Sequence, residues 1–391
     1  MAGEGAGSAP PAIAPETAAM PGAIYSPFAD RMADHPGPLF PLHVGDTWRD
    51  PFVGARCEDI ASKDHPRLHA YGDTRGLPEL IERVSQKLRD RNGLAHPPAE
   101  ILITAGATGG LATLAGAVLS PGDEILILAP FWPLIRGIAQ TFRIHPVEVP
   151  FYDVVGSARE AVAAVSARAS ERSVALYVST PSNPTGRVIP PEWLEALADW
   201  AREAGLWLVS DEVYEDYVYR GEHASLARFA PERTLSAFSF SKAYGMAGNR
   251  TGYLVGPRDV IAEAHKVGTH TAYHAPTAGQ LAALRALEGG RGWVEQAREC
   301  YREVGDETAR RLGIPAPEGG QFHFLDVRPH LDERGIWGFL SDCVDDGVSL
   351  APGPSCGRDY EGWVRLCFTA APPDEVLAAA DRLALRLGPR V

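Results

Sequence analysis

The sequence predicts an α/β fold in which a mostly parallel sheet lies between helices and a smaller domain is added. Two observations favour this class: short apolar runs alternate with helical segments between about residues 100 and 256, and less regular segments follow Gly290. Strands that are apolar on both faces need cover on both sides, as parallel sheets have. With 391 residues, of which 45% are hydrophobic, the chain is long enough for two domains.

The expected elements can be placed in chain order. Apolar runs typical of buried strands lie at 101–104, 124–129, 174–179, 206–210, 235–240 and 252–255. Amphipathic segments typical of helices lie at 109–119, 158–169, 191–204, 293–311 and 373–387. The third helix has clear limits, because Pro190-Pro191-Glu192 is a usual helix start and Gly205 a usual helix end.

This order suggests a domain division. Residues 1–21, rich in Ala, Gly and Pro, are expected to be a flexible N-terminal arm, since they lack the basic start and apolar core of a signal peptide. Residues 46–289 are expected to form a large domain. Residues 22–45 and 290–391 together are expected to form a smaller α+β domain built from both ends of the chain.

Composition narrows the partners and the compartment. A formal net charge of −13 argues against nucleic acid and against anionic membranes as partners. No stretch approaches the roughly 18 apolar residues of a membrane span. The five cysteines are scattered without a C-x-x-C pair, which favours reduced thiols in a cytoplasm and argues against disulfides or a metal site.

Two motifs carry charged groups at the ends of expected strands. Ser239-Phe240-Ser241-Lys242 is followed by Arg250, so an amine nucleophile would lie beside hydroxyls and a guanidinium suited to phosphate. Alone, such a lysine is more often a surface residue. Asp211 follows the apolar run 206–210, and a buried acid there needs a cation. Tyr214, three residues later, lies within reach of the same place, although a lone strand-end Asp is more often a helix N-cap.

Two further motifs are weak by themselves. In Pro181-Ser182-Asn183-Pro184-Thr185-Gly186, prolines and a glycine fix the backbone and aim the Asn183 amide, although Asn-Pro turns are common. In Ala105-Gly106-Ala107-Thr108-Gly109-Gly110, small residues let backbone N–H groups and the Thr108 hydroxyl approach a phosphate before a helix. The second motif is neither a Walker loop nor a Rossmann fingerprint.

Taken together, the four motifs resemble in type, order and spacing those of pyridoxal-phosphate (PLP) enzymes of fold type I, the class I/II aminotransferase superfamily. The resemblance runs from about Leu42 to the C-terminus. It implies an aminotransferase that uses pyridoxal 5′-phosphate to move an amino group between an L-amino acid and a 2-oxo acid by ping-pong half-reactions. It also implies a homodimer.

The resemblance assigns roles residue by residue. Lys242 matches the catalytic lysine that carries the cofactor as a Schiff base, and Asp211 matches the partner of the pyridine nitrogen. The positions that match the remaining cofactor contacts are Asn183 and Tyr214 at the ring oxygen, Ala107, Thr108, Ser239, Ser241 and Arg250 at the phosphate, Trp132 (or, with an offset of one, Phe131) over the ring, and Tyr71 reaching the neighbouring subunit's phosphate. Those that match the substrate contacts are Gly45, Asn183 and Arg365, the last at the α-carboxylate.

Two segments depart from the family pattern. Asp46-Thr47-Trp48 replaces the usual Glu-Pro or Asn-Pro after the glycine, and 271–277 replaces a stretch of small polar residues. Both border the substrate side chain in relatives, so the donor, the acceptor and any contact by Tyr273 or His274 stay open. Elimination, replacement or cyclisation on the same scaffold is the alternative reaction. A regulator that keeps the fold is disfavoured, because every catalytic position is present.

Overall fold

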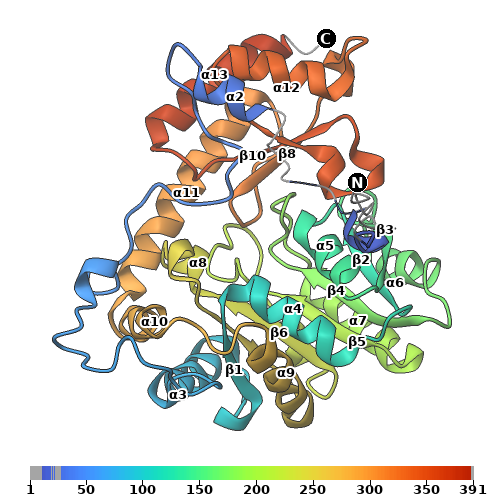
Figure 1. Cartoon of the computed structure of the whole chain (residues 1–391). Coiled ribbons are helices and arrows are strands. Elements are labelled where there is room, and N and C mark those ends of the chain that lie inside the picture. Colours follow the sequence, from blue (N-terminus) through green and yellow to red (C-terminus); the bar gives the residue numbers. More distant parts are fainter. Residues whose placement is uncertain (1–10, 19, 21, 23–27, 389–391) are drawn as a thin grey trace, which may run out of the picture.

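The computed structural model describes residues 11–18, 20, 22 and 28–388, and the rest of the expected N-terminal arm lies outside these residues. Within the arm, α1 (Pro15–Ala18) packs against α5 (Pro133–Thr141). Figure 1 shows a broad unit built on a large sheet and a second unit that carries both the C-terminal helices and α2 (Ala29–Ala33).

The large unit contains a seven-stranded sheet in the order β1-β7-β6-β5-β4-β2-β3. All neighbours are parallel except β7, which is antiparallel to both β1 and β6. The expected fold class is therefore confirmed. The strands are β1 (Ile101–Thr104), β2 (Glu124–Ala129), β3 (His145–Pro150), β4 (Ser173–Ser179), β5 (Trp207–Asp211), β6 (Thr234–Ser239) and β7 (Gly252–Val255).

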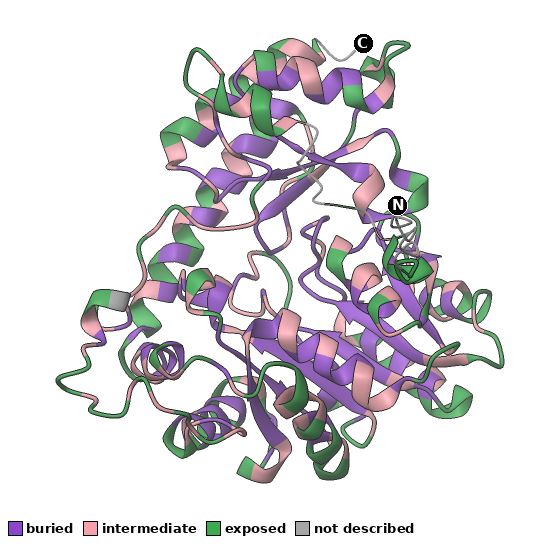
Figure 2. Cartoon of the chain, in the orientation of Figure 1, coloured by how far each residue is buried: buried purple, intermediate pink, exposed green. Residues whose placement is uncertain are grey.

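Helices cover both faces of this sheet, as the apolar strands require. Ile125 and Ile127 belong to the core cluster beneath α4 and α5, whereas Leu126 and Leu128 belong to the core cluster beneath α6 and α7. This alternation follows from the two-residue period of a strand. Figure 2 shows that the strands of this sheet are mostly buried. The helices of the unit are α3 (Pro78–Lys87), α4 (Gly106–Val118), α6 (Ala158–Ser166), α7 (Pro191–Ala204), α8 (Phe240–Ala243), α9 (Arg258–Thr271) and α10 (Thr277–Gly289).

The second unit has a small antiparallel sheet in the order β8-β10-β9. Its core also takes Phe40 and Leu42, and the backbone N–H of Cys367 donates to the carbonyl of Leu42 at 2.7 Å. The division into 46–289 and 22–45 with 290–391 stays a proposal, which this packing supports. The elements are α11 (Arg291–Leu312), β8 (Phe322–Asp326), α12 (Gly335–Asp345), β9 (Ala351–Pro352), β10 (Trp363–Cys367) and α13 (Pro373–Leu387).

The structure adds one strand to the expected set and moves the start of one helix. The added strand, β3, was not predicted because it contains Pro146 and Pro150 and is mostly not buried; such prolines are tolerated at the edge of a sheet, where one side of the strand needs no partner. Helix α4 begins at Gly106 and not at residue 109. Gly106 has a φ of 71°, a conformation that glycine adopts without strain, and this lets the helix start directly after β1.

Among the helices of the described residues, none combines the length and the apolar character that a membrane crossing requires.

Candidate active site

A cavity of about 210 Å³ opens where the carboxyl ends of β5 and β6 and the start of α4 meet the second unit. Parallel sheets collect ligand sites at this edge because the loops that leave their strands converge there. The cavity brings together all of the expected site residues except Tyr71, namely Gly45, Ala107, Thr108, Trp132, Asn183, Asp211, Tyr214, Ser239, Ser241, Lys242, Arg250 and Arg365.

Lys242 lies on the short helix α8, which begins directly after β6. The Ser239 hydroxyl caps this helix by accepting from the N–H of Ser241 at 3.0 Å. The hydroxyl of Tyr217 donates to the carbonyls of Lys242 and Ala243, at 3.0 Å each, and so holds the lysine backbone in place. Burial lowers the pKa of the Lys242 ammonium, which increases the fraction of the neutral, nucleophilic amine. Its Nζ donates to the carbonyl of Gly45.

Asp211 is the last residue of β5 and is 4% exposed. Its Oδ2 accepts from the hydroxyl of Tyr177 at 2.5 Å, a contact that the sequence did not reveal. Burial raises the pKa of Asp211 to about 6, and its hydrogen-bond partners among the described residues, the hydroxyl of Tyr177 and the N–H of Val213, are both neutral. A buried carboxylate of this kind lacks a counter-charge, and a protonated ring nitrogen would supply one.

A cradle for a phosphate lies at the other end of the cavity. Within the described residues, the guanidinium of Arg250 bonds only to backbone carbonyls, those of Ala247 at 2.9 Å and Ala105 at 3.4 Å. A Cβ on Gly106 would lie 2.4 Å from Arg250 Nη2, so only glycine lets the guanidinium approach the first turn of α4. The N–H groups of that turn, together with the Thr108, Ser239 and Ser241 hydroxyls on the same cavity, make a donor set suited to a phosphate dianion.

Arg365 lies on β10 and is 6% exposed. Its Nη1 donates to Asn183 Oδ1 and its Nη2 to the carbonyl of His43, both at 2.9 Å. The guanidinium also lies over the ring of Phe322, 4.4 Å from the ring centre. These contacts fix a buried, forked cation at the cavity, a geometry that matches a carboxylate. Sequence reasoning missed His43 and Phe322, because neither belongs to a motif.

The aromatic residue over the cavity can be chosen from geometry. Trp132 lines the cavity, whereas Phe131 is 1% exposed and belongs to the core beneath α5. Tyr214 is almost fully buried, and burial raises the pKa of its phenol. Its ring meets the ring of Phe322 edge-on at 5.7 Å, which places the phenol beside Arg365 and Asn183.

Tyr71 does not line the cavity of its own chain. It is 82% exposed, and its ring lies 4.8 Å from the ring of Tyr273 and 6.2 Å from that of His274. The Nε2 of His274 accepts from the N–H of Gly72 at 3.2 Å, which ties the 271–277 loop to Tyr71. Tyr71, Tyr273 and His274 therefore form one aromatic cluster outside the cavity.

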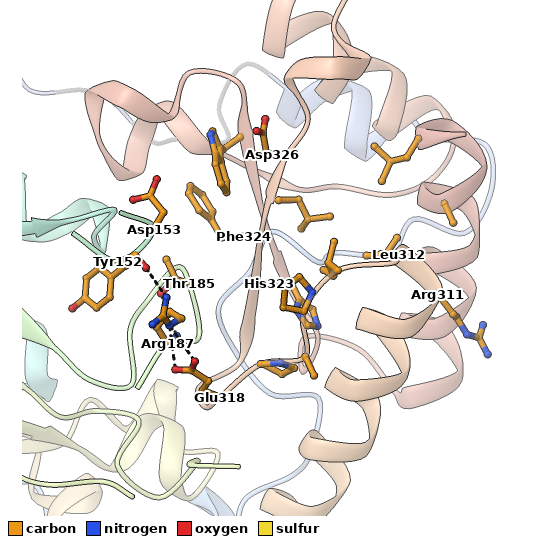
Figure 3. A pocket seen from close by; sticks show the side chains of 18 of the residues that line it. Tyr152, Asp153, Thr185, Arg187, Arg311, Leu312, Glu318, His323, Phe324 and Asp326 are labelled. Atoms are coloured by element: carbon orange, nitrogen blue, oxygen red, sulfur yellow. Dashed lines mark hydrogen bonds and ion pairs between the residues drawn. The ribbon is translucent and has the colours of Figure 1, made fainter. Parts of the chain in front are cut away.

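A second, larger cavity of about 490 Å³ lies between the two units (Figure 3). It is lined by apolar residues such as Leu312 and Leu325 together with charged side chains that already have partners. Arg187 forms an ion pair with Glu318 at 3.1 Å and donates to the carbonyl of Tyr152 at 2.9 Å (Figure 3). None of the expected site residues lines it.

Comparison with known proteins identifies the family of this chain. The family model described as aminotransferase class I and II matches residues 45–383. An aspartate/prephenate aminotransferase of Thermus thermophilus is 36% identical over 331 residues, which covers 81% of this chain and 83% of that protein. An arginine–pyruvate transaminase of Pseudomonas aeruginosa is 31% identical over 338 residues, covering 83% of this chain and 84% of that protein.

A solved structure shows the same fold. The aspartate aminotransferase of Thermus thermophilus with maleate has a TM-score of 0.87 and 31% identity, and the match covers 96% of this chain and 100% of that one. The resemblance inferred from the four motifs is thus confirmed, and the chain belongs to the class I and II aminotransferase family.

Proposed function

We infer that this enzyme, an aminotransferase, moves an amino group between an L-amino acid and a 2-oxo acid, with pyridoxal 5′-phosphate held at Lys242. One observation carries the cofactor assignment: a single cavity combines an amine with a lowered pKa, a buried acid that lacks a cation, a phosphate-type cradle and a buried guanidinium. The cofactor, when bound, supplies an aldehyde for the amine and a ring that accepts electron density from the substrate α-carbon.

The residues on the cofactor side of the cavity would each hold a different part of the cofactor. Arg250, Thr108, Ser239 and Ser241 would hold the phosphate, and Trp132 would cover the ring. Asp211 would hold a proton on the ring nitrogen, because an ionised acid in a dry site favours the charged partner. These roles stay proposals that the arrangement of the side chains supports.

The substrate would be held from the opposite side. Arg365 would bind the α-carboxylate with its forked donors, while Asn183 keeps the guanidinium oriented and the carbonyl of Gly45 borders the same space. Lys242 Nζ would then take the proton from the substrate α-carbon and deliver it to C4′ of the cofactor, since the lysine amine lies in the same cavity.

The two-step character of the reaction is the decisive test. With an amino acid but no 2-oxo acid, the enzyme should release about one equivalent of oxo acid per active site and then stop, because the amino group stays on the enzyme. Adding an acceptor should restart turnover. Continued turnover without any acceptor would instead mean elimination, replacement or cyclisation. The donor screen should include aspartate and arginine, which the names of the relatives mention.

We also propose that the active unit is a homodimer in which Tyr71 serves the neighbouring subunit. The side chain of Tyr71 is 82% exposed and does not line the cavity of its own chain, which supports this proposal. Chains carrying Lys242→Ala mixed with chains carrying Tyr71→Phe should regain activity, because one site of the mixed dimer has both residues intact. A fully active monomer would refute the proposal.

We propose a cytoplasmic location for the enzyme. Cys300, Cys343, Cys356 and Cys367 are all free thiols, which persist most easily in a reducing compartment.

A further inference from the structure

Glu212, which follows Asp211 in the chain, is a fully buried carboxylate that the proposed reaction does not use. It accepts hydrogen bonds from the hydroxyls of Ser225 at 2.7 Å and Ser210 at 3.0 Å, and it pairs with His223 Nε2 at 3.1 Å. Burying a carboxylate is costly unless donors and an opposite charge replace water. The hydroxyls supply donors, so the opposite charge has to come from His223.

His223 is suited to that role. Burial alone would lower the pKa of its imidazole, but the hydrogen bond and charge of Glu212 outweigh burial and raise it. The same contact lowers the pKa of Glu212 against the effect of burial. Within the described residues, the buried Nδ1 of His223 has no hydrogen-bond partner. In the described part of the chain, the imidazole of His223 therefore makes a polar contact with Glu212 and does not connect Glu212 to any further polar group.

The neighbouring charged residues, Glu215 and Lys87, do not supply the counter-charge for Glu212 in place of His223. Glu215 lies close enough for its carboxylate, Glu212 and His223 to have ligand atoms within 4.8 Å of one another. However, Glu215 already forms an ion pair with Lys87 and accepts from Asn92 Nδ2 at 2.5 Å. The cluster is thus two adjacent ion pairs, and Lys87 balances Glu215 while His223 balances Glu212.

The charge of Glu212 matters because of its neighbour. Burial is the main cause that raises the pKa of Asp211, and the negative charge of Glu212 raises it further. The hydroxyl of Tyr177 and the N–H of Val213 lower it. Both groups that donate hydrogen bonds to Asp211 among the described residues are neutral. An unbalanced Glu212 would therefore favour a proton on Asp211, and a protonated Asp211 cannot hold a positive ring nitrogen.

We propose that His223 is a positioning residue for amino-group transfer: through its ion pair with Glu212, it balances the charge behind Asp211 and keeps that carboxylate anionic for the cofactor. The inference rests on the proposed function. The N–H of Glu212 donates to the carbonyl of Ala237 at 2.9 Å, so the pair is also fixed to β6, the strand that leads to Lys242.

The test compares cofactor affinity across pH 5–8 for apoprotein of the wild type, His223→Gln, Glu212→Gln and the double variant. Each amide keeps the shape and a hydrogen bond but removes a charge. The midpoint of the affinity–pH curve should rise in His223→Gln by roughly half to one pH unit, as for partly screened charges several ångströms apart. In Glu212→Gln the midpoint should fall by less than that, because burial then lowers the pKa of His223 and the pair loses both of its charges. At pH 6, His223→Gln should bind about three- to tenfold more weakly.

The double variant distinguishes charge balance from packing. If the pair acts through its charges, removing both should bring the midpoint back close to that of the wild type. Glu100→Gln is the matched control, because Glu100 pairs with His96 at 2.7 Å but does not act on Asp211, and its midpoint should not move. The cofactor's own ionisations are common to all variants and cancel in the comparison.

The outcomes separate the two proposals. Shifts of the same sign in both single variants, or no return in the double variant, would overturn the role of the pair. If the single variants fail to fold, a folded double variant with a wild-type midpoint supports charge balance, and an unfolded double variant overturns it. Failure of the wild type to bind the cofactor at any pH would refute the proposed function instead.

Discussion

The two cavities differ in a way that size does not predict. The larger cavity, between the two units, has a volume of about 490 Å³, and several of its charged residues form ion pairs, among them Arg187 with Glu318 and Arg311 with Asp381 at 2.6 Å. The smaller cavity, of about 210 Å³, contains Asp211, whose hydrogen-bond partners among the described residues are neutral. In a folded protein a buried charge is normally paired.

The contrast between the two cavities indicates which of them binds a ligand. A cavity whose charges are satisfied by their neighbours is a gap in packing between two units. A cavity whose buried charge lacks its counter-charge is incomplete without a ligand, and the missing charges describe that ligand. Substitutions in the smaller cavity should therefore change catalysis, and matched ones in the larger cavity should not.

The largest effect is expected for Lys242→Ala. Loss of acid–base help alone costs roughly 10²–10⁴-fold in rate, and loss of the covalent anchor adds to it. Steady-state kinetics and the absorbance of the bound cofactor measure both losses. The control is Lys266→Ala, an exposed lysine on α9 whose removal should leave activity unchanged. Retention of more than a tenth of wild-type activity in Lys242→Ala would contradict the assignment.

Arg365→Ala should lower kcat/KM for amino acids by about 10²–10⁴-fold. Each hydrogen bond between charged groups contributes roughly 1.5–3 kcal/mol, and the fork makes two of them. Arg365→Lys should rescue part of the loss, because an ammonium keeps the charge but not the fork. Simple amines should be poor substrates, and Arg365→Ala should barely worsen them.

The matched substitution in the larger cavity is Arg311→Ala, which should change kcat/KM less than about threefold. Its partners Glu307 and Asp381 lie near the surface, where ion pairs contribute little. An equal loss on amines and amino acids in Arg365→Ala would show that Arg365 supports the fold.

Asp211→Asn should lower kcat by roughly 10²-fold, the size of one lost electrostatic contact in a transition state. It should also stabilise the apoprotein at pH 7.5. The folded-state pKa of Asp211, about 6, exceeds the ordinary value of 3.8 for an aspartate, so this group's stabilising contribution is complete below pH 3.8 and is lost as pH rises through 6. The amide should recover on the order of 2–3 kcal/mol at pH 7.5 and little at pH 4.

Thermal unfolding of the apoprotein at pH 7.5 and at pH 4 measures the stability gained by Asp211→Asn. Asp326→Asn in the larger cavity is the control, because pairing with Arg328 lowers the pKa of Asp326, and its amide should not stabilise the protein at pH 7.5. A more stable Asp326→Asn, or an unchanged Asp211→Asn, would remove the distinction between the two cavities.

The smallest effect is expected for Ala384→Leu, which fills part of the larger cavity from α13. If that cavity is a packing gap, kcat/KM should change less than about threefold, and the melting temperature should stay the same or rise. A tenfold loss of kcat/KM in a stably folded variant would mean that the junction of the two units controls the site.

The sequence by itself determined the fold class and most of the smaller cavity. Lys242, Asp211 and Asn183 follow β6, β5 and β4, and the ends of these neighbouring parallel strands converge, so motif order was enough to bring them together. Arg250 lies just before β7, and because β7 is antiparallel to β6 its start lies at the same edge. The limits of 101–104, 191–204 and 373–387 also agreed with the structure, because apolar periodicity and terminal Pro or Gly residues are local signals.

Only the tertiary structure decided the electrostatics. Tyr177 bonds to Asp211 from β4, His223 pairs with Glu212 from a later loop, and Phe322 lies under Arg365 from β8. These contacts join elements far apart in the chain, and the residue types involved are common in any core. The pKa of a buried group depends on such neighbours and on the water they exclude, so no local pattern could have predicted it.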